Sequence, residues 1–140
     1  MKAETFLSQL QKIDKLIENK LSEVEKLKRQ ADGFGGNSDS GKVKSSGKPD
    51  KMAEAVIKYV DLENEINEQI EKLINKRKEV INVIEMLNAQ EYDILHKLYV
   101  QYKTLDEVAY INQRSYTWVT TTKKRALDNV QKILDERGKR

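Results

Sequence analysis

The chain has 140 residues, of which 38% are hydrophobic and 35% charged, with no cysteine and a single histidine. These counts exclude disulfides and thiolate metal sites, and His96 alone does not make a zinc site. The first ten residues lack the apolar run of a signal peptide, and no segment reaches membrane-spanning length. We therefore expect a cytoplasmic protein that needs neither metal nor cofactor.

The net charge of +3 comes entirely from the C-terminal part of the chain. Residues 89–140 contain ten Lys or Arg and seven Asp or Glu, whereas residues 1–88 contain sixteen of each. Between residues 108 and 127 there is no acidic side chain. A local positive field of this kind attracts a phosphate backbone.

Residues 2–31 predict one long helix with a coiled-coil seam. The seam residues alternate at spacings of four and three, with Lys20 as a polar interruption. They are Phe6, Leu10, Ile13, Ile17, Val24, Leu27 and Ala31. Leu7, Leu16 and Leu21 flank this seam, and the widened stripe favours contact with more than one neighbouring helix.

Residues 32–51 interrupt the pattern and predict a flexible linker. Gly, Ser and Lys dominate this segment, and Pro49 lies near its end. A phosphate-binding glycine loop is the alternative. That motif requires a preceding strand and a Ser or Thr directly after its GK pair, and this segment has neither. Its lysines are instead expected to keep the linker soluble.

Residues 52–87 predict a second long helix with the same spacing. Its seam residues are Met52, Val56, Tyr59, Ile66, Ile70, Leu73, Val80, Ile84 and Leu87. We expect an antiparallel hairpin of the two helices, with a second copy covering the widened face to give a four-helix homodimer. Lys20, Glu63 and Arg77 interrupt the seams; they either set the register or extend to solvent at the edge.

A new domain is expected from residue 89 to residue 140. Residues 88–91 and 104–107 both have the form of a capping box, which predicts helices from about residue 89 to 102 and from 104 to 111. Tyr92, Leu95, Leu98 and Tyr99 would share one face of the first. Residues 112–114 are expected to form a turn, and Ser115 to cap a last helix that continues to about residue 137.

The last helix carries two faces of different character. Val119, Thr122, Ala126, Leu127 and Val130 mark the inward face. Three successive threonines are poor helix formers, so a partner that uses their hydroxyl and methyl groups would explain them. A helix-turn-helix with its second helix in a DNA major groove fits this pattern. The candidate DNA-binding residues are Thr104, Arg114, Ser115, Tyr116, Thr117, Thr120, Thr121, Lys123, Lys124 and Arg125.

Alternatives remain for several of these residues. The basic face is otherwise a solvated helix surface. Trp118 either packs in the core or lies near the sugar-phosphate edge, while Tyr116 is expected to be the more exposed contact. His96 is expected at the rim. No acid or serine partner accompanies it and no carboxylate pair stands out, so an enzyme is not expected.

Residues 92–127 resemble region 4 of bacterial sigma factors, through the sequence TLDEVA, a turn, SYTWV and KKRAL. In that family the position of Val119 anchors the recognition helix. The resemblance implies that Tyr116, Thr117, Thr120 and Thr121 occupy base-contacting positions. The chain departs from the family at Gln113, where glycine is usual, at Asn112, where leucine is common, and in lacking the usual arginines, so promoter specificity does not transfer.

Over nearly its whole length the chain is similar to a family of small proteins of Firmicute prophages and integrative elements. The shared features are the leucine-spaced first helix, the Ser/Gly linker, the stretch DKMAEAVIKYVDLENEIN, and the motif SYTWV followed by RAL. This resemblance implies a phage-type transcriptional regulator.

The prediction is thus an all-α protein with a coiled-coil hairpin over residues 1–88 and a helix-turn-helix domain over residues 89–140. Its expected function is sequence-specific binding of double-stranded DNA as a dimeric regulator. One alternative is an adaptor that binds RNA polymerase or another host protein through the sigma-like domain. Another is a structural helical phage protein.

Overall fold

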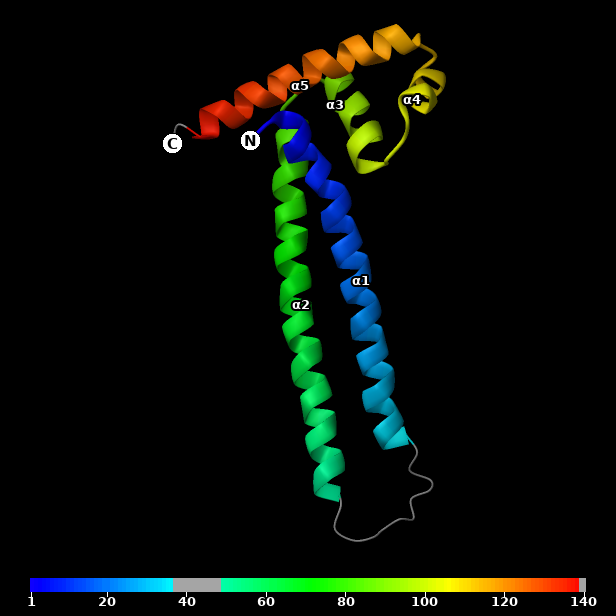
Figure 1. Ribbon diagram of the computed structural model, residues 1–140, viewed down its shortest axis with the longest axis vertical. Coiled ribbons are helices and arrows are strands. Elements are labelled where there is room, and N and C mark those ends of the chain that lie inside the picture. The colour runs from blue at the N-terminus through cyan, green and yellow to red at the C-terminus, as the bar shows by residue number, and fades with distance from the viewer. Residues whose placement is uncertain (37–48, 139–140) are drawn as a thin grey trace. The chain divides into compact units, whose positions relative to one another are not determined.

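The computed structural model of the protein describes residues 1–36 and 49–138, and these residues form helices and short connections without a strand (Figure 1). The all-α class is confirmed. The helices are α1 (Ala3–Gly36), α2 (Pro49–Glu85), α3 (Ala89–Leu95), α4 (Leu105–Asn112) and α5 (Tyr116–Gly138), and a π-helical turn η2 (His96–Val100) follows α3. Residues 37–48, the greater part of the predicted linker, lie outside the described residues.

Both long helices extend further toward the linker than the sequence pattern predicted. Helix α1 continues to Gly36, and Pro49 is the first residue of α2. A proline suits the first helical position, because its fixed φ angle matches the helix and its missing N–H has no partner to lose there.

The contacts divide the described chain into two compact units. Unit 1 comprises Met1–Lys15 and Asn75–Arg140, and unit 2 comprises Leu16–Ile74. The sequence placed a boundary at residue 88 instead. The difference arises because the first helical turns of α1 and the last turns of α2 share a core with the C-terminal helices.

Unit 2 is a pair of helical segments in contact through a small apolar core. Val24 of α1 is buried against Ile66 and Ile70 of α2, with Ile17 and Leu27 beside them. The Lys20 Nζ donates to Gln69 Oε1 at 2.7 Å. Further along, Lys28 lies 3.7 Å from Glu63. From Lys20 to Lys28 the residue numbers on α1 increase, while those of their partners on α2 decrease from Gln69 to Glu63. The two segments therefore run in opposite directions.

The polar seam residues Lys20 and Glu63 therefore both make contacts between the two helices of unit 2. The third, Arg77, makes such a contact in unit 1. There, Arg77 Nε lies 2.7 Å from Asp14 Oδ1. A displaced register would separate these pairs, so the contacts favour the register interpretation over extension to solvent. The residues are only partly buried, and such pairs contribute at most about 1 kcal/mol each.

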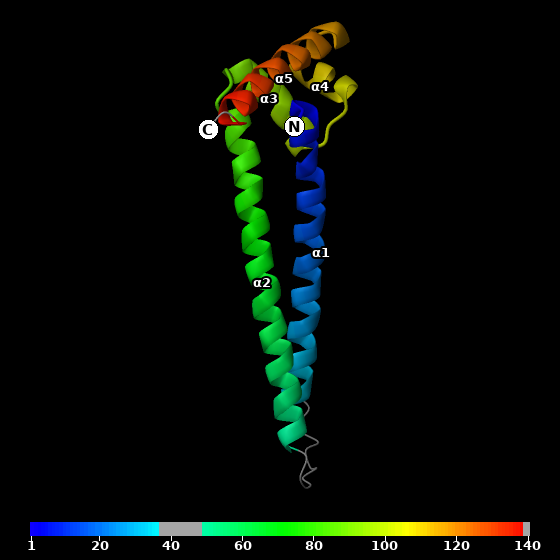
Figure 2. The same cartoon turned by 60° about the vertical axis from the view of Figure 1, so that its left-hand side comes forward.

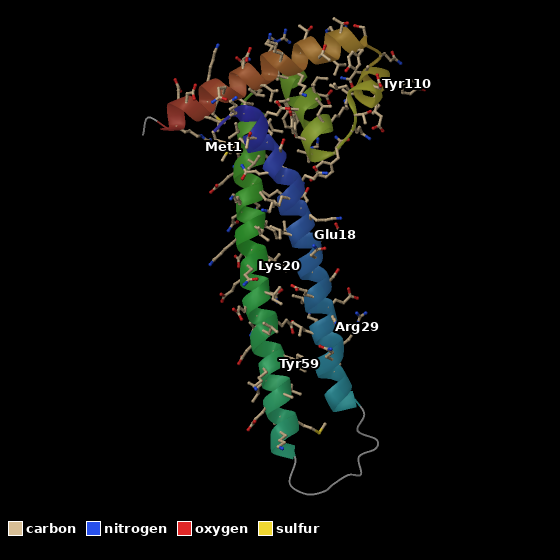
Figure 3. All side chains as sticks on the ribbon, viewed as in Figure 1. Met1, Glu18, Lys20, Arg29, Tyr59 and Tyr110 are labelled. Atoms are coloured by element: carbon tan, nitrogen blue, oxygen red, sulfur yellow. The ribbon has the colours of Figure 1, made fainter. Side chains whose placement is uncertain are left out.

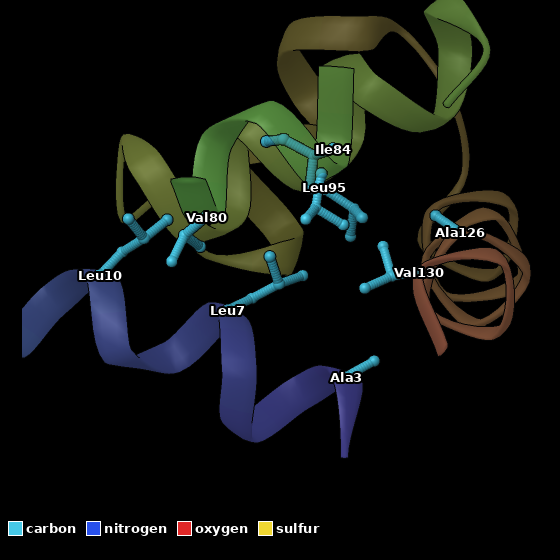
Figure 4. Packing of buried hydrophobic residues seen from close by; sticks show 9 residues of the cluster. Ala3, Leu7, Leu10, Val80, Ile84, Leu95, Ala126 and Val130 are labelled. Atoms are coloured by element: carbon cyan, nitrogen blue, oxygen red, sulfur yellow. The ribbon is translucent and has the colours of Figure 1, made fainter. Parts of the chain in front are cut away.

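The larger core cluster of unit 1 receives residues from four helices, α1, α2, α3 and α5 (Figure 4). Leu7 and Leu10 of α1 meet Val80 and Ile84 of α2, while Leu95 of α3 and Val130 of α5 close the cluster. Leu7, expected at the flank of the seam, is fully buried. It is buried because α1 contacts more than one helix here, as its widened stripe predicted.

Helix α5 lies across α3 in unit 1, as both ribbon views show (Figures 1 and 2). Beside it, α4 contacts α5 through a second core cluster. Ile94, Val108 and Val119 are its buried residues, one from each of α3, α4 and α5. The position of α5 is therefore set by two separate apolar contacts.

The helix predicted from residue 89 to 102 changes character after Leu95. Its last turn is the π-helix η2, in which the Gln101 N–H donates to the His96 carbonyl at 3.0 Å. The wider turn spreads the predicted apolar face over two directions: Leu98 joins the Ile94 cluster, and Tyr99 packs against the main core. His96 is half-buried, and its ring lies beside Tyr92, with centroids 5.4 Å apart.

The chain leaves η2 through a left-handed residue that is fastened to α1. Tyr102 has φ 58°, and its hydroxyl donates to the Leu10 carbonyl at 3.3 Å and to a carboxylate oxygen of Asp14. Burial and the Asp14 contact raise the pKa of Tyr102 to about 12. Its fixed hydroxyl offsets the cost of a left-handed conformation in a residue with a bulky side chain.

The turn between α4 and α5 was placed correctly by the sequence. Thr104 and Glu107 form the full capping box at the start of α4, with N–H donors at 2.9 and 3.1 Å from the acceptor oxygens. Gln113 ends the helix in the left-handed region with φ 55° and ψ 44°. The Ser115 Oγ then accepts from the Trp118 N–H at 3.0 Å and caps α5.

Gln113 adopts the conformation for which glycine is best suited, so we expect Gln113→Gly to raise the free energy of unfolding. Relief of the left-handed strain exceeds the entropy that glycine adds to the unfolded chain, and the net gain is about 0.5–1 kcal/mol. Chemical denaturation measures it. The matched control is Gln11→Gly on the exposed side of α1, which should cost about 1 kcal/mol. Loss of stability in both variants would contradict the left-handed assignment.

Candidate nucleic-acid interface

The carboxylate of Glu91 holds α5 against α3. Glu91 is 2% exposed. It accepts from Arg125 Nε at 2.9 Å and from Asn129 Nδ2 at 3.0 Å. The predicted capping box at residues 88–91 is therefore only half formed. Asn88 caps the Glu91 N–H at 2.8 Å, but the Glu91 side chain does not reach back to the cap, because its oxygens accept from the charged Arg125 and from Asn129 on α5 instead.

Arg125 consequently helps to hold α5 against α3. Its guanidinium also donates to Gln90 Oε1 at 3.1 Å, so both α3 residues bind the same arginine. A guanidinium held by a buried carboxylate has less charge to offer a phosphate. The sequence places Arg125 beside Lys123 and Lys124 in one basic cluster, but its contacts with Glu91 and Gln90 separate it from the two lysines.

The end of α4 is tied to α3 and η2 by a polar triad. Asp93 accepts from Lys97 Nζ at 2.7 Å and from Asn112 Nδ2 at 3.0 Å, and Lys97 also donates to Asn112 Oδ1 at 2.9 Å. Burial acts to raise the pKa of Asp93, but the hydrogen bonds and the lysine charge outweigh it and lower that pKa below its usual value. The triad keeps the carboxylate ionised and locates the turn that precedes α5.

The inward face of α5 is as predicted. Val119, Thr122, Ala126 and Val130 are buried, and Leu127 is half-buried. Because Glu91 holds the Arg125 and Asn129 side of the helix, the side that remains exposed is the one that bears Thr117, Thr121 and Lys124. These three residues recur at spacings of four and three, so they form a single stripe along the helix.

The N-terminal edge of this stripe is formed by the turn. Arg114 is exposed and its guanidinium lies 4.8 Å from the centre of the Trp118 ring, which packs against the α4–α5 core cluster. Of the two alternatives for Trp118, the structure therefore supports packing against the core. Stacking on an aromatic face orients a guanidinium while its edge N–H groups stay available to a phosphate.

The remaining candidates lie around the same stripe in different settings. Ser115 and Thr104 are exposed helix caps whose oxygens accept backbone N–H groups. Thr120 is half-buried, and its hydroxyl donates to the Thr117 carbonyl at 3.0 Å. Lys123 is half-buried with its Nζ 6.0 Å from the Tyr99 ring centre.

An open groove borders the stripe where α5 passes the start of α4. Its volume is about 340 Å³, and its lining residues are Leu105, Thr120, Lys123, Lys124, Leu127 and Asp128. Two of these lining residues are lysines, and Asp128 follows Lys124 one helical turn later on α5. The first turn of α4, which contributes Leu105 to the groove, carries the acidic residues Asp106 and Glu107.

Exposed aromatic and apolar side chains surround the turn itself. Tyr110 is 85% exposed and projects outward from α4 (Figure 3). Ile111 and Tyr116 are also exposed, with Arg114 between them in the sequence. The sequence identified Tyr116 as an exposed contact, but gave no reason to separate Tyr110 from the core.

The tertiary partners of Glu91, Asp93 and Arg125 were missed, because the sequence spacing of these residues resembles that of ordinary solvated charges. One signal existed for Glu91: it occupies a predicted capping position, and Ile94 and Leu95 follow it three and four residues later, on the same side of a helix. That position placed the glutamate at the edge of a core but did not reveal which helix would cover it.

No helix in the described ranges is both long enough and apolar enough to cross a bilayer. Within the same ranges, no cluster of three or more His, Asp or Glu side chains has the arrangement of a metal site. Comparison of the chain with protein-family models, with curated proteins and with solved structures found no match.

The basic cluster should divide into two roles when its members are changed one at a time. Arg125→Ala leaves a buried carboxylate with one donor fewer and should lower the free energy of unfolding by about 2 kcal/mol. Lys124→Ala on the exposed stripe should change it by no more than about 0.5 kcal/mol. Thermal or chemical denaturation compares them, and equal effects would contradict the structural role of Arg125.

Proposed function

We propose that the protein is a sequence-specific DNA-binding transcriptional regulator of a phage or mobile element, acting in the cytoplasm. The observation that carries this proposal is the exposed stripe of Thr117, Thr121 and Lys124 on the second helix of a tightly capped helix pair. A recognition helix needs a face that the protein's own core leaves open. This stripe meets that requirement.

The electrostatics of unit 1 support the same function. Arg114 at the turn and Lys124 on the third helical turn flank the threonines, so phosphate contacts on both sides of a groove are available. The backbone N–H groups at the N-terminus of α5 carry the partial positive charge of the helix dipole. They lie next to Ser115 and Arg114, where they favour a phosphate group. The resemblance of residues 92–127 to sigma factor region 4 agrees with this use of the helix.

Two alanine substitutions test the DNA contact. Arg114→Ala and Lys124→Ala should each weaken binding of duplex DNA and each reduce the slope of log K against log salt by about 1, because each removes one phosphate contact. A mobility-shift titration over several salt concentrations, with DNA from upstream of the gene and neighbouring genes, measures both quantities.

Lys12→Ala, an exposed lysine of α1 on the same unit, is the matched control and should leave the slope unchanged. If all three variants bind like the unchanged protein, the stripe is not the DNA contact.

We further propose that the helical hairpin dimerises the protein. In unit 2 the core of Val24, Ile66 and Ile70 covers only one side of the helix pair. Outside this core, large apolar residues of unit 2 remain exposed: Leu21, Met52, Ile57, Val60, Leu62 and Ile74. Exposed aliphatic surface of this extent on a two-helix element favours association with a second copy.

Sedimentation equilibrium of the full chain should therefore give twice the monomer mass. Ile57→Glu should shift the mass toward the monomer, because it places a charge in the proposed contact. Lys58→Glu, at the neighbouring exposed position, should retain the dimer. A full chain that sediments as a monomer at micromolar concentration would remove the basis for paired half-site binding.

A second function has one observation in its favour. The exposed Tyr110, Ile111 and Tyr116 around Arg114 have the composition of a protein-binding hot spot, which is rich in aromatic residues and arginine. An adaptor that binds RNA polymerase would use such a surface. In that case Tyr110→Ala should abolish capture of purified polymerase and leave DNA affinity unchanged. Loss of DNA affinity alone would assign Tyr110 to the DNA contact instead.

A further inference from the structure

The side chains left on the exposed stripe have an unusual chemistry for reading bases. Guanine is most often recognised by the cationic side chain of Arg or Lys, and adenine by the side chain of Asn or Gln. Residues 116–128 contain no Asn or Gln, and their one arginine, Arg125, is bound to Glu91. The arginine of the turn, Arg114, is stacked on Trp118 at the edge of the stripe.

The first two turns of the stripe therefore present threonine. Thr117 and Thr121 are both exposed and lie four residues apart, so their Cβ atoms face the same way one helical turn apart. That separation is about 6 Å along the helix axis, close to two base steps of about 3.4 Å. Lys124 follows nearly one turn later, where a helix that enters a groove by its N-terminal end approaches the backbone.

Each of these threonines carries a methyl group beside its hydroxyl. The neighbouring Thr120 already uses its hydroxyl within the helix, donating to the Thr117 carbonyl. In the major groove, the one base with an apolar group on its edge is thymine, through its 5-methyl group. A surface of threonine methyl groups is therefore complementary to thymine. With Lys124 assigned to the DNA backbone, the stripe has no cationic side chain left for guanine.

We propose that Thr117 and Thr121 read two thymines through their 5-methyl groups, so that the protein selects a thymine-containing core sequence. This inference rests on the proposed DNA-binding function and specifies the base chemistry of the same site. Thr117 and Thr121 are then the specificity-determining residues, while Arg114 and Lys124 supply affinity that does not depend on sequence.

The experiment begins with selection of bound duplexes from a random DNA pool by the full-length protein. The selected core should contain thymine at two positions about two steps apart. Replacing those thymines with deoxyuridine removes only the methyl groups. Affinity should then fall about fourfold per methyl group, the value of burying one methylene-sized group.

Threonine-to-serine variants complete the test, since serine keeps the hydroxyl and lacks the methyl group. Thr121→Ser should bind the thymine duplex and the duplex with deoxyuridine at its contacted position equally well. Thr117→Ser should do the same for the other position. Thr5→Ser, an exposed threonine at the start of α1, is the control and should keep the full fourfold discrimination.

The possible outcomes separate the two proposals. Failure to retain any duplex, even at low salt, would overturn the proposed function itself. Binding that is equally strong with thymine and deoxyuridine in the unchanged protein would leave DNA binding intact and overturn the methyl-reading inference. A selected core made only of G·C pairs would overturn the inference in the same way.

Discussion

The exposed face of α5 depends on the buried carboxylate of Glu91. Glu91 is the one charged residue that is buried among the described residues, and its partners Arg125 and Asn129 lie four positions apart on α5. Removing a carboxylate from water is costly unless charged or polar donors surround it. That requirement fixes the rotation of α5, since turning the helix by one residue would move both donors away from α3.

The apolar contacts of α5 fix the same orientation of the helix. Val119 packs between α3 and α4, and Val130 packs against α1 and α2, so the helix is held near both ends of its inward face. What remains outward is determined by exclusion: Thr117, Thr121 and Lys124 have no place in either core. The exposed stripe thus arises from the side of α5 that the core does not use.

In the turn before α5, hydrogen bonds of polar side chains hold a backbone conformation that glycine would adopt without strain. Gln113 adopts a left-handed conformation in which glycine would be relaxed, and Asn112 stands beside it in the triad with Asp93 and Lys97. At these two positions the chain departs from the sigma-like pattern. The hydrogen bonds of Asn112 give the end of α4 a fixed position, and the strain at Gln113 is the cost of the turn that follows.

The sequence by itself determined the all-α class, the presence of the helices and the inward face of α5, because these depend on local spacing. The heptad positions, the Thr104–Glu107 box and the Ser115 cap could all be predicted within one or two residues. The tertiary structure alone decided the division into two units, the π-helical turn, and the separation of Arg125 from Lys124. Those features depend on which helix covers which charge, and a buried glutamate and a solvated one have the same sequence spacing until the covering helix is in place.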